Sequence, residues 1–114
     1  MPKVFSTLQR PDLSPPLHGA KVTVTLVDPT FHEPITGAIA STTAFVQGEA
    51  YAYTDALGYW SMNLVANSLI TPSGSLYLIS TDMIGGSIIG DVEGDVTISV
   101  PSGAGPYWVG AILA

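Results

Sequence analysis

The chain of 114 residues contains no cysteine, which excludes disulfide bonds, thiol catalysis and thiolate metal sites. Charged residues are also scarce: they make up 11% of the chain, whereas hydrophobic residues make up 46%. Ordinary soluble domains carry about 25% charged residues. Apolar surface that charges do not cover is commonly buried against other subunits, so this composition predicts a protein that works within an assembly.

Basic residues are absent after Lys21. Lys3, Arg10 and Lys21 are the only ones in the chain, while eight of the nine acidic residues follow Lys21 and the net charge is -6. Binding to a nucleic-acid backbone needs clustered Lys and Arg, so this distribution argues against DNA or RNA as a direct partner.

Long apolar runs are missing as well. No stretch approaches the ~18 consecutive apolar residues that cross a bilayer. Prolines interrupt the first residues of the chain, where a signal peptide would need a continuous apolar stretch. We therefore expect no membrane-spanning segment and no secretory leader.

Residues 1–20 contain four prolines and no clear helical or strand period. This predicts an extended N-terminal arm, which either docks on a neighbouring subunit, straps its own domain or is disordered. Val4, Phe5 and Leu8 favour docking, because a free tail rarely keeps such residues. Lys3 and Arg10 would then meet carboxylates of the partner.

Residues 21–114 are predicted to form one β-sandwich domain. Val22, Val24 and Leu26 alternate with polar residues, which is typical of a half-buried strand. Further strands are expected at residues 38–45, 49–54, 59–64, 75–81, 87–92, 94–100 and 107–113. Turn residues separate them at a spacing of roughly ten, which predicts an all-β, antiparallel β-sandwich of seven to eight short strands. Almost no helix is expected, and the one candidate is a single turn near residues 64–69.

The stretch from residue 54 to 64, TDALGYWSMNL, predicts a tight turn rather than a reactive site. Asp55 and Gly58 occupy the first and fourth turn positions, where Asp accepts backbone hydrogen bonds and Gly takes a positive φ. The turn places Trp60, Met62 and Leu64 on one strand face, so Trp60 is expected to anchor the core. A sugar-stacking role for this tryptophan would need a second exposed aromatic side chain nearby.

Several motifs together suggest a family. Residues 54–60, Asn67-Ser68, residues 71–74 (TPSG), Leu76-Tyr77 and Val100-Pro101 resemble the small sandwich modules of tailed-bacteriophage virion proteins. Those modules are similar to transthyretin-like and carboxypeptidase-regulatory-like sandwiches. The resemblance covers residues 22–101 and implies a structural protein of the virion.

In many relatives the module heads a long fibre or tail protein, whereas this chain ends at Ala114. We therefore expect a capsid decoration (cement) protein that binds the major capsid protein or other virion subunits, as a homotrimer. The alternative is a head- or tail-attached binding module that recognises carbohydrate or a host surface through loops at residues 82–87 and 101–108. The predicted partner-binding residues are Lys3, Phe5, Leu8, Arg10, Tyr107 and Trp108.

Motifs for chemistry are weak. Asp91, Glu93 and Asp95 offer oxygen ligands for calcium, but a solvated turn is the favoured interpretation because Gly90 and Gly94 interrupt the strand. His18 and His32 are too few for a hydrolytic zinc site. Serine lies in no Gly-x-Ser-x-Gly motif. We expect no enzymatic activity, no bound metal and no cofactor.

Overall fold

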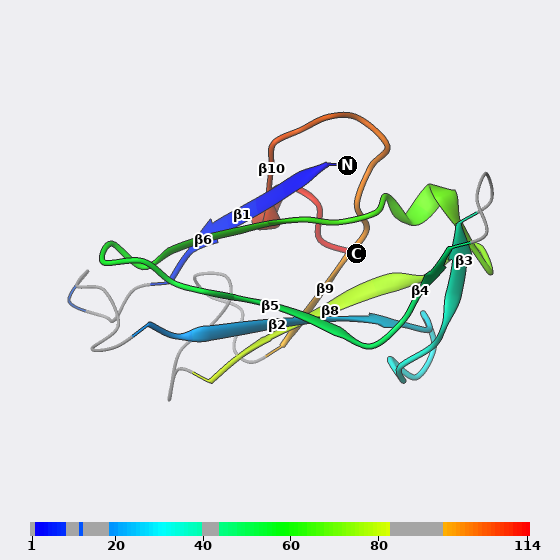
Figure 1. Ribbon diagram of the computed structural model, residues 1–114, viewed down its shortest axis with the longest axis horizontal. Coiled ribbons are helices and arrows are strands. Elements are labelled where there is room, and N and C mark those ends of the chain that lie inside the picture. The colour runs from blue at the N-terminus through cyan, green and yellow to red at the C-terminus, as the bar shows by residue number, and fades with distance from the viewer. Residues whose placement is uncertain (1, 9–11, 13–18, 40–43, 83–94) are drawn as a thin grey trace.

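The computed structural model describes residues 2–8, 12, 19–39, 44–82 and 95–114 (Figure 1). Over these ranges the chain is all-β, which confirms the predicted fold class. The first sheet has the strand order β10-β1-β6, built from β10 (Tyr107–Trp108), β1 (Lys3–Thr7) and β6 (Tyr59–Asn63). The second has the order β5-β2-β8-β9, built from β5 (Glu49–Tyr53), β2 (Lys21–Val27), β8 (Leu76–Thr81) and β9 (Val96–Ile98).

A third, small sheet lies at one end of the molecule (Figure 1). Its strands are β4 (Phe45–Val46), β3 (Gly37–Ile39) and β7 (Ile70–Thr71). Helical structure in the described ranges is limited to two short 3-10 turns, η1 (Asn67–Leu69) and η2 (Val109–Ala111). These ranges therefore hold almost no helix, as expected, and the candidate turn near residues 64–69 is present as η1.

The core lies between the first two sheets. Along β2 the inward residues Val22, Val24 and Leu26 are all buried, as their alternation predicts. Trp60 on β6 faces them from the first sheet and is fully buried, which confirms its predicted role as a core anchor. The other buried core residues are Val4, Leu8, Ala20, Leu64, Ile70, Tyr77, Ile79, Val96, Ile98, Val100 and Val109.

The position of β1 differs from the predicted arm. This strand is the middle strand of the first sheet, antiparallel to β6 and parallel to β10. Its inward side chains, Val4 and Ser6, are buried, and Leu8 just beyond it is buried too. Residues 3–8 are therefore part of the sandwich rather than an arm outside it. Residues 9–11 and 13–18 lie outside the described residues.

Two other predicted strands differ from the structure. Residues 38–45 hold parts of two short strands, β3 and β4, and residues 40–43 between them are not described. In the range 107–113 the strand β10 ends at Trp108 and gives way to η2. The strand expected at residues 87–92 falls outside the described part of the chain.

The predicted turn after β5 is confirmed. The Asp55 carboxylate oxygen Oδ1 accepts hydrogen bonds from the backbone N–H groups of Leu57 at 2.8 Å and Tyr59 at 3.0 Å. The N–H of Gly58 donates to the carbonyl oxygen of Asp55, and Gly58 has a φ of 81°. This compact turn carries the chain from β5 in the second sheet to β6 in the first.

Candidate interaction surfaces

The outward face of the first sheet carries a row of aromatic side chains. Phe5 on β1 and Trp108 on β10 are cross-strand partners, so their side chains lie next to each other on the same face. On the other side of Phe5, the ring of Tyr59 on β6 stacks against it, with centroids 6.1 Å apart and planes inclined by 29°. Three aromatic residues from three strands therefore form one surface, which we call the aromatic face.

The indole of Trp108 is held in place on this face. It is 49% exposed, and a Cβ atom built on Gly110 would overlap its six-membered ring. The ring therefore lies directly against the backbone of η2. An exposed aromatic side chain fixed in this way loses little conformational freedom when it binds a partner.

The predicted partner-binding residues do not all lie on one surface of the structure. Lys3, Phe5 and Trp108 come together, because Lys3 is exposed two residues before Phe5 and alternate residues share a face. Leu8 was predicted to bind a partner, but this is wrong: its side chain is 1% exposed and packs in the core. Tyr107 is half-buried and pairs with the buried Val4. Arg10 lies outside the described residues.

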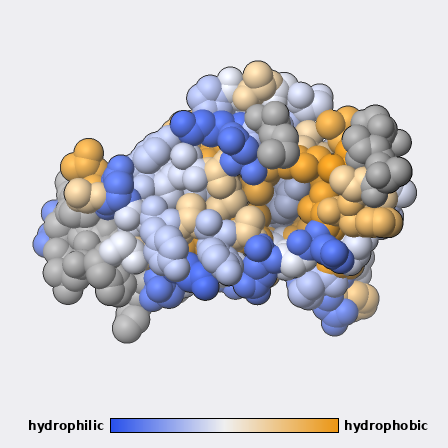
Figure 2. Space-filling model, in the orientation of Figure 1, coloured by the Kyte–Doolittle hydropathy of each residue, from blue (hydrophilic) through white to orange (hydrophobic). Residues whose placement is uncertain are grey.

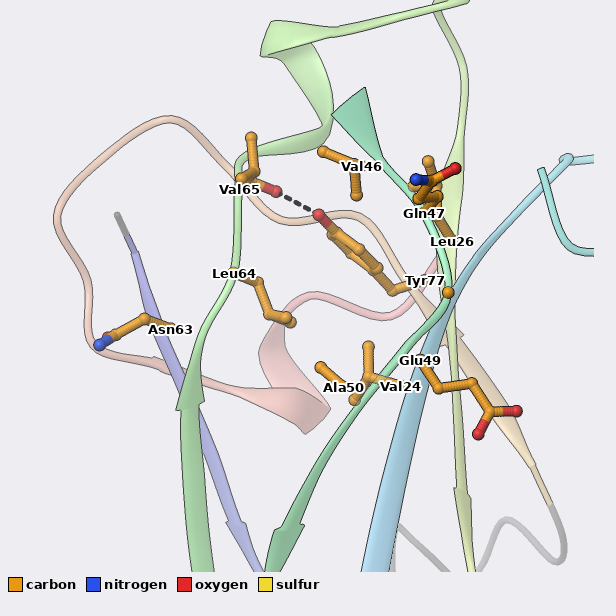
Figure 3. A pocket seen from close by; sticks show the side chains of 11 residues that line it. Val24, Leu26, Val46, Gln47, Glu49, Ala50, Asn63, Leu64, Val65 and Tyr77 are labelled. Atoms are coloured by element: carbon orange, nitrogen blue, oxygen red, sulfur yellow. Dashed lines mark hydrogen bonds between the residues drawn. The ribbon is translucent and has the colours of Figure 1, made fainter. Parts of the chain in front are cut away.

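A groove opens between β5 and β6, next to buried core residues (Figure 3). Its volume is about 190 Å³. In Figure 3 the side chains of Leu64 and Tyr77 point into the space, while the carboxylate of Glu49 points away from it. The residues that line it are Val24, Leu26, Val46, Gln47, Gly48, Glu49, Ala50, Asn63, Leu64, Val65 and Tyr77. Glu49 is the one charged residue among these.

The floor of the groove is fixed by a hydrogen bond. The Tyr77 hydroxyl donates to the carbonyl oxygen of Val65 at 2.7 Å (Figure 3). Burial raises the pKa of Tyr77 to about 12, because the phenolate would lose its hydration there. The phenol therefore stays protonated and keeps this hydrogen bond at neutral pH.

A second hollow of about 360 Å³ adjoins the groove. Val65 lines both, and the second hollow is otherwise lined by Pro2, Ala66, Leu69, Ser102, Gly103 and Ala104. Figure 2 shows apolar residues gathered at this end of the molecule. We call the groove and the hollow, which share Val65, the apolar end.

The loop after β2 displays another apolar side chain. The Asp28 carboxylate accepts hydrogen bonds from the backbone N–H groups of Thr30, Phe31 and Glu33, at 2.9, 2.7 and 3.0 Å. The hydrogen bond from Phe31 is the largest cause that holds the pKa of Asp28 below its ordinary value. The loop leaves Phe31 77% exposed.

The predicted metal-binding residues do not form a site in the part of the chain that the structure describes. No group of three or more His, Asp or Glu side chains there could hold a metal ion. Asp91 and Glu93 of the calcium hypothesis, and His18, lie outside the described residues, and His32 lies in the Asp28 loop with a φ of 55°. None of the described helices is long and apolar enough to span a membrane.

Comparisons with known proteins add no identity: no protein-family description matches the chain, and no curated protein matches it either. Sequence reasoning missed the groove, although it expected the strand at residues 49–54 that borders it. The missing signal is that β6 pairs with β1 rather than with β5, and a residue pattern within β5 does not carry that information.

Proposed function

We propose that the protein is a structural subunit of a tailed-bacteriophage particle, namely a capsid decoration protein that binds the major capsid protein or other virion subunits. The observation that carries this proposal is the apolar end, where two hollows lined mostly by apolar residues, with Leu69 exposed beside them, lie on a chain with few charges. Apolar residues gathered at the surface are typical of contacts with other proteins. The resemblance of residues 22–101 to virion sandwich modules supports the same function.

The proposed mechanism is docking without chemistry. Val65 and Leu69 at the apolar end would be covered by a neighbouring subunit, and burial of an aliphatic side chain contributes roughly 1.5 to 3 kcal/mol. Several copies acting together would multiply weak individual contacts. We propose a homotrimer, because capsid lattices offer threefold positions and closed cyclic symmetry is common among homo-oligomers.

The test measures whether the purified protein binds again to phage particles that lack it, produced from a phage genome in which its gene has been deleted. Purified protein is mixed with these particles, and the bound fraction is measured by sedimentation. A Leu69→Asp variant tests the apolar end, and Leu57→Asp is the matched control, because both leucines are exposed but Leu57 lies in the Asp55 turn at the other end of the molecule (Figure 1).

We expect the wild type and Leu57→Asp to sediment with the particles and Leu69→Asp to lose at least tenfold in affinity. Failure of the wild-type protein to sediment with them would refute the proposed function. If Leu69→Asp and Leu57→Asp bound equally well, the contact would have to lie outside the apolar end.

A second candidate function is carbohydrate recognition, and the aromatic face favours it. Sugar stacking was considered above for Trp60, which is buried, whereas Trp108 is 49% exposed and has the half-buried Phe5 directly beside it. Ser61 pairs with Phe5 on the other side and supplies a hydroxyl group on the same face. The test is a glycan array probed with the wild type and with Trp108→Ala. A signal that disappears in the variant would support this function, and a blank array would exclude it for the sugars present.

A further inference from the structure

Strands β5 and β6 follow each other through a tight turn but do not form a hairpin. The N–H of Asp55 donates to the carbonyl oxygen of Tyr59 at 2.9 Å, close to the turn. Beyond that point β5 pairs with β2 and β6 pairs with β1, in different sheets. The two strands therefore separate from the turn onward (Figure 1), and the groove lies where they are apart.

The open edge of β5 has unused backbone groups. Thr54 donates its N–H to the carbonyl oxygen of Ala20 at 3.0 Å. This bond identifies the residues of β5 whose backbone groups are hydrogen-bonded to β2. Because hydrogen-bonded and non-hydrogen-bonded pairs alternate in an antiparallel ladder, Ala50 and Ala52 also bond to β2. The backbone N–H and C=O groups of Glu49 and Tyr51 consequently point away from β2, toward the open edge.

The edge of β6 that faces away from β1 also has unpaired backbone groups. Leu64 donates its N–H to the carbonyl oxygen of Pro2 at 3.0 Å, and Leu8 donates to Gly58 at 2.7 Å. The same alternation turns the backbone groups of Ser61 and Asn63 away from β1. Residues of both strands line the groove, so two unpaired strand edges border one apolar space.

Side-chain exposure shows that no strand of the first sheet covers the groove. Val24 and Ala50 are cross-strand partners, so their side chains share the inner face of the second sheet. Val24 is 2% exposed, whereas Ala50 is exposed although it points to the core side. An inward-facing residue is exposed here because the first sheet does not reach over this end of β5.

We propose that the groove binds an extended segment of a neighbouring protein subunit, which adds to β5 as a further strand. This inference rests on the proposed function and names the kind of contact that the apolar end makes. The unpaired N–H and C=O groups of Glu49 and Tyr51 supply the hydrogen bonds of such a strand, as in other cases of strand addition. The segment covers Ala50.

The size and charge of the groove also determine which side chains the bound segment carries. A cavity of about 150 Å³ accommodates a benzene molecule, so a volume of about 190 Å³ has room for a side chain of that size. The segment accordingly carries apolar residues at alternate positions. Glu49 is the charged residue at the rim, so a Lys or Arg on the segment gives charge complementarity there.

The first test uses a synthetic peptide of the stated chemistry, the acetylated and fluorescently labelled hexapeptide Lys-Val-Thr-Val-Thr-Val. Fluorescence anisotropy measures its affinity for the full-length protein. Two control peptides carry N-methyl groups on all valines or on all threonines, because N-methylation removes the N–H donors along one edge of a strand. We expect the parent peptide to bind and one of the two controls to lose at least tenfold in affinity.

Variants of the protein locate the bound strand. Ala50→Arg fills the groove and should weaken peptide binding at least tenfold, while Glu49→Lys should weaken it severalfold and leaves the apolar lining intact. Tyr51→Ala, on the outward face of the same strand, is the matched control and should bind as the wild type does. Hydrogen exchange should slow at the Glu49 and Tyr51 amides when the peptide is bound.

The inference is overturned if the parent peptide does not bind at millimolar concentration, if both N-methylated peptides bind equally well, or if Ala50→Arg and Glu49→Lys have no effect. The rebinding experiment separates this failure from that of the proposed function. If the wild type and Ala50→Arg sediment equally with particles, strand addition is wrong and the structural role stands. If the wild type does not sediment, the structural role itself is wrong.

Discussion

The hydroxyl of Tyr77 on β8 and the carbonyl oxygen of Val65, just after β6, are joined by a hydrogen bond of 2.7 Å. This bond links the second sheet to the chain that leaves the first, at the point where the two sheets separate to leave the groove. The Tyr77 side chain, itself buried, therefore connects the two sides of the groove. Its ionisation and its removal both have measurable consequences.

Tyr77→Phe should lower the free energy of unfolding by about 1 kcal/mol at neutral pH, because one hydrogen bond is lost. The ordinary pKa of tyrosine is 10.0 and the folded protein raises that of Tyr77 to about 12, so its stabilising contribution is complete below pH 10 and is lost as the pH rises through 12. Urea unfolding at pH 8 and pH 11.5 should show the gap between wild type and variant narrowing at the higher pH. A gap that stays constant would contradict this role.

Protonation of Asp28 at low pH should weaken the loop at residues 28–33, because the carboxylate of Asp28 accepts hydrogen bonds from backbone N–H groups there. Its pKa lies below the ordinary value of 3.8, chiefly through the hydrogen bond from the Phe31 backbone, so its contribution is present above pH 3.8 and is lost as the pH falls through the lowered value. Asp28→Asn should therefore reduce the Tm more at pH 7 than at pH 2.5. Thermal scans of both proteins at the two pH values check this, and equal reductions would count against it.

Asn67 should be required for stability although it belongs to a short polar segment. Its Oδ1 atom accepts a hydrogen bond from the N–H of Val100 at 2.7 Å, and both residues are buried. Asn67→Ala leaves that N–H without a partner, which costs about 1 to 3 kcal/mol. Ser68→Ala is the matched control at the neighbouring exposed position. Urea unfolding should separate the two variants clearly, and similar values would refute the assignment.

Gly110→Ala should displace the indole of Trp108, because the added methyl group would overlap the ring. Trp60 is fully buried and Trp108 is half-exposed, so acrylamide quenches mainly the fluorescence of Trp108. We expect stronger quenching in Gly110→Ala than in the wild type and no change in Ala111→Ser. Unchanged quenching would mean that the indole is not held by η2.

The local parts of the fold could be predicted from the sequence. The alternation of Val22, Val24 and Leu26 located β2 and its buried face, and the Asp55 and Gly58 pair located the turn. Trp60 was correctly assigned to the core, because its distance from that turn fixes the face on which it lies. In each case the evidence lies within a few neighbouring residues.

The parts that depend on distant pairing could not be predicted. β1 pairs with β6 and β10, which come from the middle and the end of the chain, and its five residues are too few to show a reliable period. Leu8 was consequently assigned to a partner contact instead of the core. The groove was missed for the same reason, since it exists only because β5 and β6 pair in different sheets.

The most direct measurement is the number of copies of this protein per particle in gradient-purified phage, determined by quantitative mass spectrometry. The structural role predicts a constant ratio to the major capsid protein across the fractions that contain intact particles. Protein that stays in the soluble fractions, with no fixed ratio to the capsid, would contradict it.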